Sequence, residues 1–108
     1  MDEHALQLAG FQKKYLRKLA HDVKAVVQVG DAGLGDAIHA AVDTALHDHE
    51  LVKVRLRRPE DKREDARRLA SRAGAALCGL VGHTVILYRP HPESPQIELP
   101  QRGGSPPA

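Results

Sequence analysis

The 108-residue sequence predicts an α/β domain in which helices pack on a four-stranded sheet as a two-layer sandwich. Three observations lead to this prediction. Short β-branched runs alternate with longer segments of helical periodicity, glycine or proline marks most of the junctions, and the expected order of elements is α-β-α-β-α-β-β. At this length we expect one domain with one modest core, and 42% of the residues are hydrophobic.

The first helix is expected over residues 9–20, where apolar and basic side chains occupy different sides of a helical wheel. The apolar side, which includes Phe11 and Tyr15, is predicted to pack on the core. The other side carries four cations and no acid: Lys13, Lys14, Arg17 and Lys18. We interpret this side as an anion-binding face, and a merely solvated helix surface is the alternative.

A short buried strand is expected at residues 25–29, AVVQV, because this β-branched run lies between charged residues and a glycine. A glycine-rich loop follows at residues 30–35. The next helix is expected to begin at Leu34 or Asp36 and to end near His47, since its apolar residues recur at helical spacing. An acid in the first turn also suits the helix dipole.

The clearest strand is expected at residues 51–57, LVKVRLR, in which apolar side chains alternate with Lys53, Arg55 and Arg57. The apolar side is predicted to face the core and the basic side to face outward. A third helix is expected to start at Pro59, with acids early, arginines late and a glycine cap at its end.

A β-hairpin is expected next, formed by AALCGLVG and HTVILYRP with a tight turn at Gly82. From Pro90 onward, six of the seven prolines fall within 19 residues, a composition that cannot build a packed core. The segment IELP, residues 97–100, is expected to dock in an extended form. We therefore predict a domain over residues 1–100 and a disordered Pro/Gly-rich tail over residues 101–108.

Charge is distributed in blocks along the chain. Residues 1–30 carry five basic and three acidic side chains, residues 31–50 carry none and five, and residues 51–72 carry nine and four. This polarisation favours an anionic partner for the basic segments. No apolar run approaches the roughly 18 residues that span a bilayer, and the first residues do not resemble a secretory signal. We therefore expect a cytoplasmic protein without membrane attachment.

The sequence offers little for catalysis or for cofactors. The glycine loop does not match the GxGxxG fingerprint of nucleotide-binding proteins, and the chain has no GK[ST] motif. The histidine-rich stretch His47–Glu50 lacks both HExxH and a cysteine pair. The lone Cys78 is expected to be a small buried side chain without a base partner. We expect no enzymatic activity, no cofactor, no metal and no small-molecule substrate.

The glycine loop does offer a contact for phosphate. A GxxG motif connects the first strand to the second helix: Gly30, Asp31, Ala32 and Gly33. Glycines let another backbone approach closely, and the free amides at a helix start favour an anion. The KH module clamps nucleic-acid backbone with such a loop. A plain turn would use the same residues, so this alternative stays open here.

Taken together, these residues resemble a known family. The motifs KKYLRKLAH, VQVGDAGL, HELVKV and LYRP are similar to those of the CRM domain, and specifically of the stand-alone bacterial YhbY-like proteins, over roughly Leu8 to Pro100. The resemblance implies a fold like the C-terminal domain of translation initiation factor three. It also implies RNA binding and an association with precursors of the large ribosomal subunit.

Carried over to this chain, the family's RNA-binding loop falls on residues 30–33. Many CRM domains place lysine or arginine inside this loop, whereas this chain has Asp31 and Ala32 there. Positive charge is therefore expected from other elements: Lys13, Lys14, Arg17 and Lys18 of the first helix, and Lys24 beside the first strand.

We thus predict a monomeric, non-enzymatic protein that binds ribosomal RNA in precursors of the large subunit. Three aromatic residues, Phe11, Tyr15 and Tyr88, are too few for extensive base stacking, so the prediction favours RNA shape over sequence. The alternative is a protein-interaction module that docks on a ribosomal or assembly protein. It would use the outward basic strand at residues 51–57 or the arginine-rich third helix.

Overall fold

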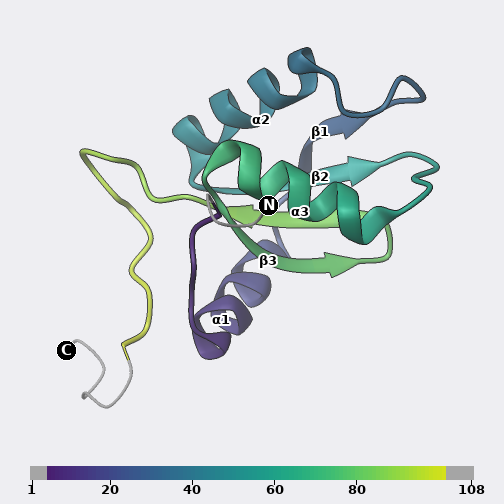
Figure 1. Cartoon of the computed structure of the whole chain (residues 1–108). Helices are drawn as coiled ribbons and strands as arrows, with labels where there is room; N and C mark the ends of the chain where they lie inside the picture. Colours follow the sequence, from purple (N-terminus) through teal and green to yellow (C-terminus); the bar gives the residue numbers. More distant parts are fainter. Residues whose placement is uncertain (1–4, 102–108) are drawn as a thin grey trace.

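The computed structural model describes residues 5–101 (Figure 1). Its elements, in chain order, are α1 (Gly10–Ala20), β1 (Ala25–Val29), α2 (Asp36–His49), β2 (Leu51–Leu56), α3 (Lys62–Ala73), β3 (Ala76–Val81) and β4 (Thr84–Tyr88). The α/β class, the order of the elements and the four-stranded sheet are thereby confirmed. The predicted tail at residues 101–108 lies, apart from Gln101, outside the described residues.

The sheet is mixed and has the strand order β1-β2-β4-β3. β1 pairs with β2 in parallel, and β4 runs antiparallel to both β2 and β3. Three strands, β1, β2 and β3, therefore point in the same direction, and β4 returns between two of them. As a result, β1 and β2 end side by side at the same end of the sheet. The glycine loop begins there.

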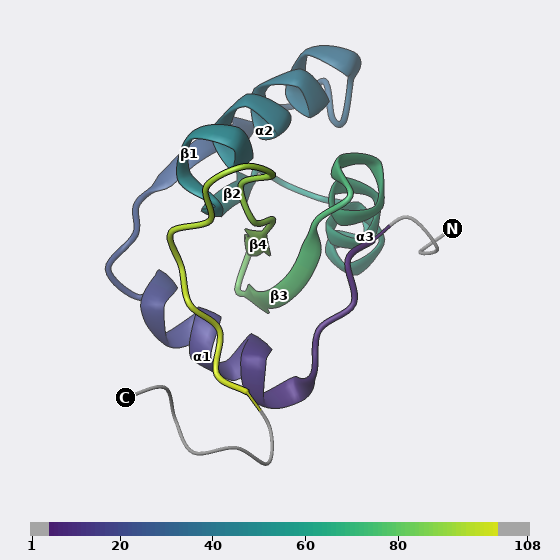
Figure 2. The same cartoon turned by 90° about the vertical axis from the view of Figure 1, so that its left-hand side faces the viewer.

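Helices cover both faces of the sheet, so the structure has three layers and the prediction of two layers was wrong. α2 and α3 cover one face, and α1 lies on the other (Figure 2). The reason lies in β4, where the run Val85–Tyr88 is buried at every residue and therefore presents apolar side chains to both faces. Leu16 and Ala20 of α1 pack on the second apolar face.

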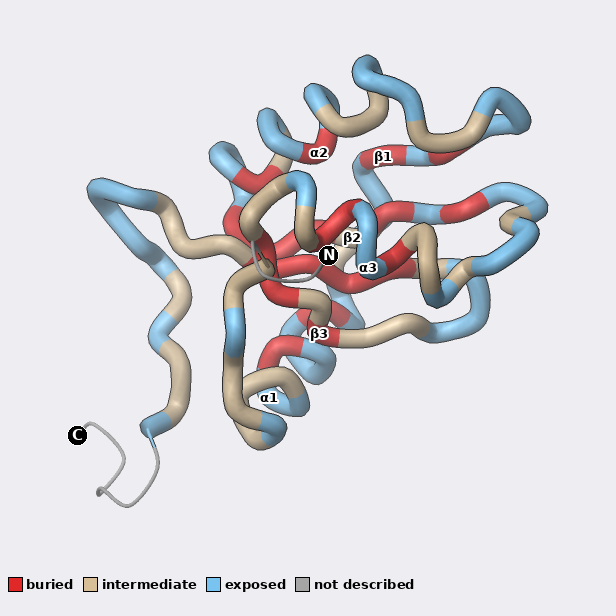
Figure 3. Tube along the Cα trace, in the orientation of Figure 1, coloured by how far each residue is buried: buried red, intermediate tan, exposed pale blue. Residues whose placement is uncertain are grey.

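Burial alternates along the first two strands (Figure 3). β1 was predicted to be a buried strand, but it lies at the edge of the sheet. Val27 and Val29 are buried, whereas Val26 is 50% exposed. The prediction that Tyr15 belongs to the core was also wrong, because the buried side of α1 is narrow and leaves Tyr15 37% exposed.

The third helix begins later than predicted, at Lys62. Asp61 is its N-cap and accepts a hydrogen bond from the Glu64 amide at 3.1 Å. Gly74 caps the carboxyl end of the helix with φ 64°, and the predicted glycine cap is therefore confirmed. The predicted hairpin is confirmed, with β3 and β4 joined by a turn that contains Gly82 at φ 59°.

The segment after β4 runs in an extended form along α1 (Figure 2). Ile97 and Leu99 pack against the core cluster of α1, and the Gln12 side chain donates to the Pro100 carbonyl oxygen at 3.2 Å. The predicted docking of IELP is therefore confirmed.

Glu50 fixes the path of this segment, a role that the sequence analysis did not assign. Its buried carboxylate accepts three hydrogen bonds from backbone amides, those of His91 at 2.7 Å and of Gln96 and Ile97 at 2.9 Å each. Its own carbonyl oxygen accepts from the Arg89 amide at 2.9 Å. Glu50 also has φ 63°, so the chain turns sharply where α2 ends and β2 begins.

Candidate nucleic-acid interface

The glycine loop joins the carboxyl end of β1 to the start of α2. The Gly33 amide donates to the Gly30 carbonyl oxygen at 3.1 Å, which closes a β-turn. Among the described residues, the backbone amides of Asp31 and Ala32 donate no hydrogen bond. The N-cap of α2 is Gly35, which has no side chain to cap the helix amides. Several backbone donors are thus left for an anion such as a phosphate oxygen.

Gly33 is the glycine on which the turn depends, because its φ of 78° lies in the left-handed region. We expect Gly33→Ala to lower the free energy of unfolding by roughly 1 to 2 kcal/mol, measured by urea denaturation. Gly30→Ala is the matched control, since Gly30 is not in that region and an added Cβ would meet no atom within 4 Å. Equal losses in the two variants would contradict this assignment.

A recess of about 420 Å³ opens between the loop and the connection from β2 to α3. Gly30, Asp31 and Gly33 line one side of it. Its cationic lining consists of Arg57, Arg58 and Arg68, and its acidic lining consists of Asp31, Glu60, Asp61, Glu64 and Asp65. The recess therefore has mixed charge, and its cations come from the segment after β2 and from α3.

Arg57 connects this recess directly to the first strand. Its amide donates to the Val29 carbonyl oxygen at 3.1 Å, which continues the pairing of β1 with β2 beyond the end of the strands. Its Nε lies 4.0 Å from Oδ1 of Asp31. Both side chains are about two-thirds exposed, so this ion pair is weak and readily exchanged for another anion.

Two arginines of α3, Arg68 and Arg72, face the first half of α2. Arg72 Nη2 lies 3.1 Å from Oδ1 of Asp36. The pKa of His39 is lowered, first by burial and then by the positive charges of Arg72 and Arg68, while Asp36 acts in the opposite direction. Arg68 and Arg72 therefore add positive charge beside the start of α2, where Asp36 partly offsets it.

The four predicted cations of α1 lie elsewhere, on the face of the sheet opposite α2 (Figure 2). Lys14, Arg17 and Lys18 are exposed and Lys13 is half-buried. Arg17 has a structural role, because its Nη1 donates to the Cys78 carbonyl oxygen at 2.7 Å.

Gly79 makes the position of Arg17 possible. A Cβ added at Gly79 would lie 2.7 Å from Cδ of Arg17, so only glycine leaves room for the arginine stem to cross β3 there. The register of β3 against β4 shifts at the same place, between Leu77 and Gly79. Arg17 thus holds α1 on the sheet in addition to carrying charge.

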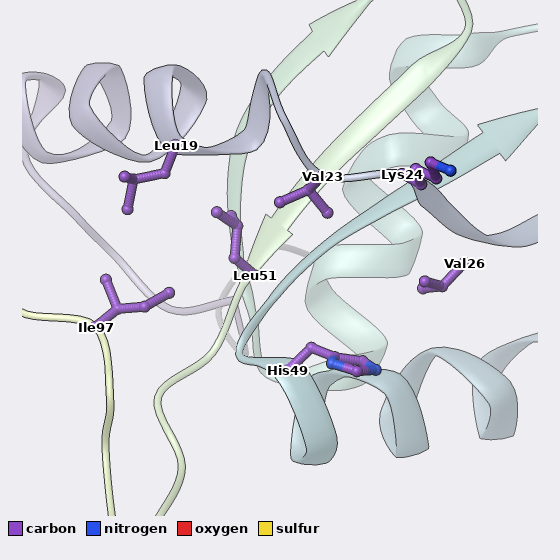
Figure 4. Close-up of a pocket in the computed structure, with 7 residues that line it drawn as sticks. All are labelled: Leu19, Val23, Lys24, Val26, His49, Leu51 and Ile97. Carbon is purple, nitrogen blue, oxygen red and sulfur yellow. The ribbon is translucent and has the colours of Figure 1, made fainter.

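Lys24 precedes β1 and lies at the end of this strand remote from the glycine loop, roughly 16 Å away along a five-residue strand. There it lines an apolar recess of about 450 Å³ together with Leu19, Val26 and His49 (Figure 4). The predicted site residues therefore form two groups. The glycine loop lies at one edge of the sheet, and the cations of α1 and Lys24 lie apart from it.

The cations nearest to the loop, Arg57, Arg58 and Arg68, were not among the predicted RNA-binding residues. A signal for two of them was available. In a sheet with adjacent parallel strands, ligands bind beyond the carboxyl ends of the strands. The GxxG motif follows β1, and the pair Arg57-Arg58 follows β2. Arg68 lines the recess only because α3 packs beside the loop, and the sequence carries no local signal for this position.

The structure also shows where the other chemically active groups lie. Cys78 is buried, as predicted, and burial raises the pKa of its thiol to about 11, which keeps it a poor nucleophile. Within residues 5–101, no cluster of histidine, cysteine or acidic side chains is arranged to hold a metal ion. In the same part of the chain, no helix is both long and apolar enough to cross a membrane.

Comparison with known proteins places this arrangement in a family. The chain is 37% identical over 95 residues to the "Probable RNA-binding protein YqeI" of Bacillus subtilis, which covers 86% of this chain and 99% of that protein. It is 36% identical over 93 residues to an "RNA-binding protein" of Haemophilus influenzae, covering 84% and 93%.

The fold has a counterpart among solved structures. The solution structure of protein SAV1595 from Staphylococcus aureus superposes with a TM-score of 0.77 at 34% identity, covering 87% of this chain and all of that one. The family model of the CRS1 / YhbY (CRM) domain matches residues 8–89, which span α1 to β4. This chain therefore belongs to the CRS1/YhbY (CRM) domain family.

Proposed function

We propose that this protein binds RNA without catalysis, and that its target is ribosomal RNA in cytoplasmic precursors of the large ribosomal subunit. One observation carries the proposal: the unpaired amides of Asp31 and Ala32 in the glycine loop lie beside Arg57 and Arg58 at the carboxyl edge of the sheet. The names of its relatives support the RNA part of the proposal. The ribosomal target rests on the family resemblance of its motifs.

The mechanism is electrostatic. Backbone amides of the loop donate to one phosphate group, and the surrounding cations release counterions from the RNA. Exposed aromatic area is small, because Tyr88 is 2% exposed and Tyr15 is 37% exposed. Base stacking therefore contributes little, and the affinity depends mainly on phosphate contacts.

A filter-binding titration tests the proposal. Transcribed large-subunit ribosomal RNA is titrated with the protein over a series of salt concentrations. We expect the logarithm of the affinity to fall linearly with the logarithm of the salt concentration, because each phosphate contact releases counterions. No binding, or binding that does not respond to salt, would refute RNA binding. Equal affinity for an unrelated RNA would refute the ribosomal target alone.

Asp31→Lys gives a sharper test of the loop. The change removes the ion pair with Arg57 and adds a cation, so two positive charges become available to phosphate. We expect tighter RNA binding, by roughly threefold to tenfold near 0.15 M salt. We also expect the slope of log affinity against log salt concentration, the salt slope, to become steeper by about 1 to 2.

Asp48→Lys is the matched control for Asp31→Lys, since Asp48 is exposed near the far end of α2 and the charge change is the same. If both variants gain affinity equally, the gain reflects net charge. If neither changes while substitutions on α1 do, the glycine loop is only a turn.

A further inference from the structure

α1 leaves part of its sheet face uncovered. Strand pairing defines rows of residues that share this face. The row of Leu51, Tyr88 and Ala76 lies under α1 and is buried. The row nearer to the carboxyl ends of β1 and β2 is open, and none of its members is buried: Gln28, Arg55, Thr84 and Val81. We call these four residues the open row.

The charge of the open row comes from Arg55, whereas Val81 at its end is an exposed apolar side chain. Arg55 is exposed at its centre, and Lys53 precedes it on the same face of β2. Lys53 lines a recess of about 190 Å³ with Arg17 and His21 of the α1 region and with Thr84 and Val81 of the open row. Among residues 5–101, no acidic side chain lines that recess. Over the described residues, neither Lys53 nor Arg55 forms an ion pair.

The open row also connects the two separated groups of predicted site residues. Arg17 lies at the α1 end of the recess with Lys53. Along the chain, Arg55 comes two residues before Arg57, which lies beside the glycine loop. Since residues two apart on a strand lie about 6.6 Å apart, Lys53 to Arg57 spans about 13 Å of positive charge. A strip of cations thus runs from α1 to the glycine loop.

We propose that the open row and Lys53 bind the phosphate backbone of the RNA between α1 and the glycine loop, an inference that rests on the proposed function. Phosphate is favoured over bases, because the open row has no aromatic side chain on which a base could stack. The Thr84 hydroxyl and the Gln28 amide are side-chain types that donate to phosphate and sugar oxygens. An acidic protein segment would suit the same charge, and the test below decides whether RNA is bound there.

The test compares Lys53→Gln/Arg55→Gln with the intact protein in the salt titration on large-subunit ribosomal RNA. Two lost phosphate contacts are expected to reduce the salt slope by roughly 1.5 to 2 and to weaken binding by about tenfold or more near 0.15 M salt. The matched control is Arg63→Gln/Arg67→Gln, which removes the same charge from α3 on the opposite side of the sheet. This control is expected to change the slope by less than half as much.

Gln28→Lys provides a test that needs no loss of function. It adds a cation to the open row at an exposed position, so we expect tighter binding and a slope steeper by about 1. Thermal melts check that each variant folds, and the exposed changes Arg55→Gln and Gln28→Lys carry the test if Lys53→Gln does not fold.

The outcomes separate the two proposals. An intact protein that binds no RNA refutes the proposed function and this inference together. An intact protein that binds RNA, with variants of the open row that match the α3 control, refutes this inference alone. Loss with the double variant and gain with Gln28→Lys support the inference.

Discussion

Glu50→Ala is expected to lower the free energy of unfolding by about 3 kcal/mol or more. The carboxylate accepts three backbone hydrogen bonds, and a hydrogen bond to a charged group contributes a net stability of about 1.5 to 3 kcal/mol. Its removal leaves the amides of His91, Gln96 and Ile97 without their acceptor. Urea denaturation measures the loss.

Two further variants show whether the carboxylate itself is responsible. Glu50→Gln preserves the size and one acceptor oxygen, so we expect a smaller loss of stability. Glu93→Ala removes an exposed acid from the same segment and is expected to have little effect. Amide hydrogen exchange should show lost protection at Gln96 and Ile97 in Glu50→Ala alone. A loss no larger than that of Glu93→Ala would contradict the anchoring role.

The same carboxylate predicts how stability depends on pH. Burial by itself would raise the pKa of Glu50, but the hydrogen bonds from His91, Gln96 and Ile97 outweigh it and lower the pKa below its ordinary value of 4.5. A lowered pKa in the folded state means that Glu50 contributes stability above pH 4.5, and that this contribution is lost as the pH falls through the folded-state pKa. Glu50→Gln should lack this part of the acid destabilisation, which denaturation curves at several pH values can measure.

Lys13→Gln/Lys14→Gln/Lys18→Gln is expected to have the largest effect on RNA binding. These three side chains of α1 carry no described ion pair, so their charge is available to phosphate. We expect the salt slope to fall by roughly 2 to 3 and the affinity near 0.15 M salt to fall by about a hundredfold. The free energy of unfolding should change little, because Lys14 and Lys18 are exposed and Lys13 is half-buried.

Arg17 is left intact in this triple variant for a structural reason. Its guanidinium donates to the Cys78 carbonyl oxygen, so its removal would disturb the docking of α1 as well as the charge. The α3 variant Arg63→Gln/Arg67→Gln gives the loss per charge that net charge alone causes. If the triple variant loses no more per charge than that, α1 is not part of the RNA interface.

Much of the fold could be predicted because its signals are local. The alternation in LVKVRLR predicted β2, and Gly74 predicted the end of α3. The third layer could not be predicted in the same way, since a run such as Val85–Tyr88 does not reveal from the sequence that both of its faces are covered. The periodicity of the sequence therefore led to a prediction in which α1 and α2 lie in the same layer.

The candidate site was predictable only in part. The GxxG motif is contiguous, so it could be found by reading along the chain. Its nearest cations belong to the segment after β2, and their proximity follows from the parallel pairing of β1 with β2. The anchoring role of Glu50 depends on a segment more than forty positions away, which no local pattern reveals.

The contact between Arg17 and Gly79 has a consequence for mutational scanning of this protein. A scan of RNA binding would rank Arg17 above its three lysine neighbours, because its loss tilts or frees α1 and moves their charges as well. Gly79→Ala would then mimic that phenotype without removing any charge, since its new methyl group displaces the Arg17 stem. Two residues on different elements would thus score as one binding determinant, although one of them has no polar side chain at all.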